Sequence, residues 1–98
     1  MDTTETLRVL STAYDEKELR QLLSKVMDVA LSQQQHRLRR YDRELQEFEQ
    51  RYVMDSAVFY EQFEAGQLGD EMDYFEWAGL YELRQALEQK IQQLERAR

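Results

Sequence analysis

The sequence predicts an all-α fold, a long helical hairpin in which a short helix stands between two long helices. The 98-residue chain has no proline, and its three glycines all fall between Gly66 and Gly79. Because proline and glycine interrupt helices most often, the chain on either side of that window can form long, unbroken helix. We therefore expect one helical domain over 15–98, preceded by a segment 1–14 of uncertain structure.

Residues 1–14 fit more than one element. Leu7, Val9 and Leu10 are compatible with a short strand, a helical turn or a frayed tail. A strand followed by a helix is typical of ribbon-helix-helix DNA-binding proteins, which read bases with basic or amide side chains on the strand. Only Arg8 suits that role, so the segment gives little support to DNA binding.

The first long helix is predicted over 16–52. Asp15 followed by Glu18 has the spacing of a capping box, which marks a helix start. The following ~37 residues contain neither glycine nor proline and would form roughly 55 Å of helix. The polar run 32–35 is either an exposed continuation or a break, and the sequence does not decide between them.

The beginning of this helix is apolar on several faces. Such a helix is buried by several neighbours, and a chain this short can hardly supply them. We therefore expect self-association, as a homodimer or a larger oligomer, through the long helices. The residues predicted to form the oligomer interface are Leu19, Leu22, Leu23, Val26, Met27, Ala30 and Leu31.

The second half of this helix carries a heptad seam. Apolar residues recur at alternating gaps of three and four, the spacing of a coiled-coil face. They are Leu38, Tyr41, Leu45, Phe48 and Tyr52, with Met27, Leu31 and the polar Gln34 continuing the seam upstream. The basic cluster 36–40 is expected to be a solvated face that pairs with Asp42 and Glu44.

A short helix is predicted over 56–65. Asp55 can cap its N-terminus, and Phe59 and Phe63, four residues apart, define its apolar face. Gly66 suits the left-handed backbone conformation that commonly ends a helix.

The third helix is predicted over 71–97, with Asp70 as its cap and Asp73 reinforcing that cap. Gly79 lies inside it at some cost, which suggests close approach of another helix. The residues expected on its buried side are Phe75, Trp77, Leu80, Leu83, Leu87, Ile91 and Leu94.

Composition argues against most kinds of chemistry. There is no cysteine and only one histidine, so we predict no metal site, no cofactor and no enzymatic activity. No apolar run reaches the ~20 residues of a membrane span, and the apolar part of the N-terminus is too short for a signal peptide. The net charge of −7 disfavours nucleic acids and anionic membranes as partners. We expect a cytoplasmic, prokaryotic protein.

Acidic charge is concentrated in the middle of the chain. Residues 41–81 hold eleven Asp or Glu against two Lys or Arg, whereas the parts before and after carry a net charge of +1 each. Such a block favours a basic protein partner, or it is simply a solvated surface. The predicted partner-binding residues are Asp70, Glu71, Asp73, Phe75, Glu76 and Trp77, the two aromatic ones on condition that they are exposed.

A sequence motif adds a family resemblance. Residues 48–83 contain F-E-x-x-Y-x-M and then F-x-x-x-F-x-x-G-x-L-G-D-x-x-D-x-F-E-W. The pattern resembles small prokaryotic proteins, some of which are antitoxin partners of TumE-type toxins in two-gene loci. It is carried by Phe48, Tyr52, Met54, Phe59, Phe63, Gly66, Leu68, Gly69, Asp70, Asp73, Phe75, Glu76 and Trp77.

The resemblance implies a helical antitoxin that binds and neutralises a small basic toxin. Val53 departs from the pattern, because the pattern has a glycine there that would end the first helix.

The alternative is a self-associating helical adaptor or scaffold without a toxin partner, in which the aromatic residues are core. A DNA-binding autorepressor would need a basic dimer face around 37–40. Burial of Trp77 and the identity of any bound protein separate these hypotheses.

Overall fold

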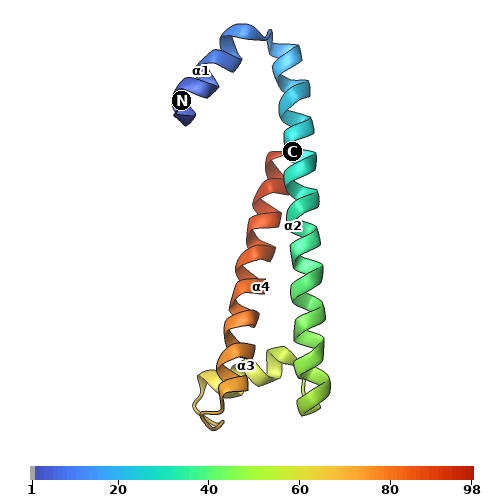
Figure 1. Ribbon diagram of the computed structural model, residues 1–98, viewed down its shortest axis with the longest axis vertical. Helices are drawn as coiled ribbons and strands as arrows, with labels where there is room; N and C mark the ends of the chain where they lie inside the picture. The colour runs from blue at the N-terminus through green and yellow to red at the C-terminus, as the bar shows by residue number, and fades with distance from the viewer. Residues whose placement is uncertain (1) are drawn as a thin grey trace.

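The computed structural model describes residues 2–98, which form an all-helical, elongated molecule of 58 × 22 × 20 Å. The helices are α1 (Thr3–Ala13), α2 (Glu16–Tyr52), α3 (Ser56–Glu64) and α4 (Met72–Ala97). The long helices α2 and α4 lie side by side and antiparallel, and α3 crosses the closed end of this hairpin (Figure 1).

Helix α4 is shorter than α2 and covers only part of it. Arg98 forms an ion pair with Asp28 at 2.8 Å, so α4 ends about a third of the way along α2. The first part of α2, residues 16–27, extends past that point. Helix α1 turns away from α2 at this open end of the molecule (Figure 1). Within residues 2–98, neither α1 nor α4 covers the whole of this open end.

The segment 1–14 is helical over Thr3–Ala13, so the strand alternative is wrong. Asp2 caps this helix, since its carboxylate accepts a hydrogen bond from the Glu5 backbone N–H at 2.8 Å. Leu7, Val9 and Leu10 therefore lie on helix rather than on a strand, and no side chain of α1 is buried.

Helix α2 begins where the capping box predicts and continues without a break through 32–35. The Glu18 backbone N–H donates to Asp15 at 2.8 Å, and the Glu18 carboxylate accepts from the Asp15 N–H at 3.1 Å. Asp42 does not pair with the basic cluster 36–40, because it binds Arg84 of α4 instead.

The short connection after α2 depends on Val53. This residue ends the helix in the left-handed conformation, with φ of 51°, and its side chain is 89% exposed. A β-branched residue is strained in this region, where glycine is not. The valine does not lengthen α2, because the helix ends at Tyr52 as the sequence predicts.

We predict that Val53→Gly stabilises the chain by about 0.5–1 kcal/mol. The left-handed conformation costs a residue with a Cβ about 1–2 kcal/mol, and the greater unfolded-state freedom of glycine returns part of that gain. Because the valine side chain is exposed, removing it sacrifices no buried apolar contact. Urea unfolding followed by circular dichroism measures the difference. Gly66→Ala is the converse control, since Gly66 has φ of +71°, and it should destabilise the chain by about 1 kcal/mol.

Helix α3 starts as predicted and ends one residue early. Asp55 caps it through the Ala57 backbone N–H at 2.7 Å, and its last residue is Glu64. The predicted start of the last helix needs a correction. Glu71, not Asp70, is its N-cap residue, and no side chain bonds to its free N–H groups. Asp73 does not reinforce a cap, because its carboxylate is held by α2.

Two apolar clusters hold the hairpin together. The lower one has Leu45, Phe59, Trp77 and Ala78 at its centre, and the upper one has Leu31, Leu87 and Ile91. The heptad seam of α2 therefore packs against α4 of the same chain. Leu31 was predicted at the oligomer interface, but it is buried here by the chain's own α4. Gln34, the polar member of the seam, has its amide oxygen buried without a hydrogen-bond partner among residues 2–98.

Two residues expected in the core lie outside it. Phe75 and Leu83 are 54% and 55% exposed. Phe75 precedes Trp77 by two residues, which places it about 200° away around the helix. Because Trp77 points inward, Phe75 points outward.

Candidate functional site

A groove lies between α2 and the first half of α4. It has a volume of about 790 Å³ and is lined by apolar or small residues, which we call its floor, and by four glutamates, which we call its rim. Helix α2 contributes Glu44, Glu47 and Phe48; helix α4 contributes Phe75, Glu76, Gly79, Leu80, Glu82, Leu83 and Ala86. We call this set the acidic groove.

The floor of the acidic groove exposes large apolar side chains. Phe75 and Leu83 are the most exposed of them, and each is more than half accessible. Phe75 makes an edge-to-face contact with Phe63 at 5.5 Å between ring centroids. Apolar surface of this kind in a hollow commonly marks an interaction site.

The rim of the acidic groove carries carboxylates that are free to bind. Among residues 2–98, Glu44, Glu47 and Glu76 form no ion pair or side-chain hydrogen bond. Glu82 accepts a hydrogen bond from the Tyr60 hydroxyl at 2.6 Å, and this bond is the main reason that the pKa of Tyr60 is raised. The rim therefore presents concentrated negative charge beside an apolar floor.

Trp77 fixes the position of the groove's walls. It is fully buried, with its ring stacked on Phe59 at 3.8 Å and near Phe48 and Tyr52 at 5.6 and 5.7 Å. Its indole N–H donates to the buried Ser56 hydroxyl at 2.9 Å. Trp77 was predicted as a partner contact on condition of exposure; because it is buried, it supports the site from within.

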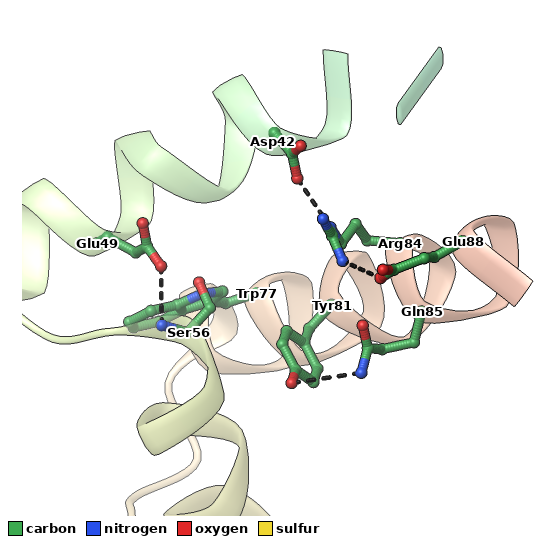
Figure 2. A network of polar contacts seen from close by, with 8 residues as sticks. All are labelled: Asp42, Glu49, Ser56, Trp77, Tyr81, Arg84, Gln85 and Glu88. Atoms are coloured by element: carbon green, nitrogen blue, oxygen red, sulfur yellow. Dashed lines mark hydrogen bonds and ion pairs between the residues drawn. The ribbon is translucent and has the colours of Figure 1, made fainter. Parts of the chain in front are cut away.

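Polar contacts on the other side of the hairpin tie the same three helices together (Figure 2). The Glu49 carboxylate accepts the backbone N–H of Ser56 at 2.9 Å, which joins α2 to the start of α3. Arg84 lies between Asp42, at 2.8 Å, and Glu88, and so links α4 to α2. The residues that form these contacts do not line the acidic groove.

The predicted acidic contacts do not form one surface. Asp70 and Glu71 are exposed just before α4, and Glu76 lies on the groove rim. Asp73 instead faces α2, where it accepts hydrogen bonds from Tyr52 at 2.6 Å and Arg51 at 2.7 Å. These two bonds lower the pKa of Asp73, and the bond to Asp73 raises the pKa of Tyr52 to about 12.

We predict that Asp73 makes the free energy of unfolding depend on pH in the acidic range. Because the folded-state pKa of Asp73 is lowered, its contribution to the free energy of unfolding is complete at pH values above the ordinary pKa of a carboxylate. That contribution is lost as pH falls through the lowered pKa. Asp73→Asn should therefore be less stable than the wild type at pH 7, and the difference should shrink towards zero at strongly acidic pH. Urea unfolding at a series of pH values tests this. An unchanged difference at low pH would contradict it.

Several groove residues escaped the sequence prediction. Glu44 was expected to pair with the basic cluster 36–40, Glu47 was given no role, and Leu83 was expected on the buried side. A signal was present, since Phe75, Gly79, Leu83 and Ala86 follow each other at gaps of four, four and three. That spacing defines a second stripe on α4, separate from the one that faces α2.

A second exposed apolar surface lies at the open end of the molecule. Of the predicted oligomer residues, Leu23 and Val26 are exposed, and Leu19, Leu22, Met27 and Ala30 are half-buried. Leu7, Val9, Tyr14 and Val29 add exposed side chains from α1 and α2. The net charge here is close to neutral, in contrast to the acidic closed end.

No family model, curated protein or solved structure matches this chain. Within residues 2–98, no three acidic or histidine side chains are grouped as metal ligands would be. None of the described helices is long and apolar enough to cross a lipid bilayer. The acidic groove and the open end are therefore the two features on which a functional argument can be built.

Proposed function

We propose that this chain is a protein-binding module, an antitoxin that neutralises a small basic toxin of a prokaryotic two-gene pair. The observation that carries the proposal is the acidic groove, where exposed apolar side chains lie inside a rim of unpaired glutamates. Apolar anchors surrounded by charge are typical of protein interfaces, and negative charge selects and steers a basic partner. The motif over 48–83 supports the toxin as that partner.

The groove revises the set of residues that we assign to partner binding. Phe75 and Glu76 remain in it, with Glu44, Glu47 and Leu83 added. Asp70 and Glu71 lie beyond its end, where they add to the field that attracts a basic protein. Asp73 and Trp77 act indirectly, because each holds α4 in place against α2.

Self-association at the open end is the second part of the proposal. Leu23, Val26 and Val29 leave apolar surface on α2 where neither α1 nor α4 covers it. Two copies joined there would cover this surface and leave both acidic grooves free. The same observation favours the alternative function, a self-associating scaffold without a toxin partner.

A tagged pull-down from the native cell, followed by mass spectrometry, separates the two functions. Recovery of a stoichiometric small basic protein, whose growth arrest is relieved when this chain is co-expressed, is the expected result. Recovery of the chain alone would reject the antitoxin and favour the scaffold. Light scattering of the purified chain gives the number of copies in either case.

A further inference from the structure

A second hollow extends the acidic groove along α4 towards the open end. It is lined by Arg37, Tyr41, Leu83, Ala86, Leu87 and Lys90, and it shares Leu83 and Ala86 with the acidic groove. The two hollows together follow α4 from Phe75 to Lys90, a length of about 22 Å. The floor is apolar throughout, but the rim changes from glutamates to Arg37 and Lys90.

The surface along this path alternates large and small residues. Phe75 and Leu83 are large and exposed, whereas Gly79, which lies between them, and Ala86, three residues after Leu83, are small. Alternation at gaps of three and four is how a helix surface receives the side chains of another helix.

Gly79 has no explanation within the chain's own packing. Apart from its two neighbours and the backbone of its own helix, no atom of residues 2–98 lies within 4 Å of the place where a Cβ on residue 79 would stand. Glycine inside a helix costs about 1 kcal/mol relative to alanine. Since nothing in this chain needs the missing Cβ, the space suits close approach by a helix from outside.

From these observations we propose that the extended groove binds one amphipathic helix of about fifteen residues from the partner. Its apolar stripe packs between Phe75 and Leu83, with its closest approach at Gly79. Its lysines and arginines lie over Glu44, Glu47 and Glu76, and its acidic end lies over Arg37 and Lys90. The inference rests on the proposed function, because it describes the part of the basic partner that enters the groove.

A helix fits this surface better than an extended peptide. An extended segment needs backbone partners, which sheet edges supply and which residues 2–98, being all helix and turn, do not offer. A helix satisfies its own backbone groups. A second copy of this chain is also disfavoured, because two acidic closed ends would repel each other.

The test uses a synthetic fifteen-residue peptide and the full chain. The peptide carries leucines at alternating gaps of three and four, lysines in one half and glutamates in the other. A second peptide of identical composition places the leucines at every second residue. Fluorescence anisotropy measures affinity, and NMR shift changes locate the bound peptide. We expect micromolar binding of the first peptide only, with shifts confined to the extended groove.

Gly79→Leu is the decisive variant. Leucine fills the depression and is expected to weaken binding at least about 10-fold, since a buried clash of this size removes more than 1.4 kcal/mol. The same change should raise Tm by about 4 °C, because leucine favours helix over glycine. Loss of binding together with a gain in stability excludes misfolding as the cause. Gln89→Leu, on another face of α4, is the matched control and should bind as the wild type does.

Three results would overturn the proposal that a helix occupies the groove. They are equal binding of both peptides, unchanged affinity in the Gly79→Leu variant, or NMR shift changes at the open end. Failure of the proposed function is distinguishable. If substitution of the groove glutamates weakens binding of the co-purifying basic protein but Gly79→Leu does not, the antitoxin proposal is supported and the proposal of a helical occupant is rejected. If no basic protein co-purifies but the helical peptide binds as described, the proposal that the groove binds a helix is supported and the antitoxin proposal is rejected.

Discussion

Trp77→Ala is expected to destabilise the chain by about 3–5 kcal/mol, the range for removing a large buried aromatic side chain. Trp77 is fully buried and touches aromatic rings from α2 and α3, so its loss opens a cavity where three helices meet. It also leaves the Ser56 hydroxyl without its donor. Because small domains have total stabilities near the lower end of about 5–15 kcal/mol, this variant should be largely unfolded at 37 °C.

Phe75→Ala provides the contrast, on the same helix and two residues away. Its ring is more than half exposed, so we expect a loss of stability of at most about 1 kcal/mol. Its loss should nevertheless weaken partner binding, since it removes an apolar anchor from the groove floor. Circular dichroism melts compare the variants.

If Trp77→Ala does not fold, Trp77→Phe, which keeps a ring and loses the indole N–H, should lower the free energy of unfolding by about 1–3 kcal/mol. Equal effects of Trp77→Ala and Phe75→Ala would contradict the placement of these side chains.

Reversing two charges on the groove rim is expected to weaken binding of the basic partner by about 100-fold at low salt. The variant is Glu47→Lys/Glu76→Lys, with one change on each wall of the groove. Neither carboxylate forms an ion pair within residues 2–98, so folding should be unaffected. Each change adds two positive charges, so the net charge goes from −7 to −3. Unfavourable contacts with lysines and arginines of the partner replace favourable ones.

Glu61→Lys/Glu95→Lys is the matched control, because it makes the same change in net charge on exposed helix positions outside the groove. We expect it to lower the association rate by at most a few-fold, through the weaker long-range field. Surface plasmon resonance at several salt concentrations separates the two effects. The wild type should lose affinity as salt rises, and the groove variant should be much less sensitive. Equal loss in both variants would show that net charge acts without a localised site.

Local signals in the sequence were sufficient for most of the fold. The capping box at Asp15, the cap at Asp55 and the absence of proline predicted helices α2 and α3 closely, because these features act within a few residues of chain. The heptad seam of α2 also predicted a packed face. It did not identify the partner helix, since the same spacing suits a second chain or the chain's own α4.

Only the tertiary structure decided which apolar residues are core and which are surface. Phe75, Trp77 and Leu83 are equally apolar in sequence, but packing against α2 and α3 fills one side of α4 with Trp77 and leaves the other two outside. Asp73 and Glu76 are likewise both acidic, yet one is bound by Arg51 and Tyr52 and the other lines the groove. The direction of a side chain depends on neighbours distant in the sequence. For that reason the sequence determined the helices and the acidic character of this protein, and the packing of α4 against α2 determined its candidate site.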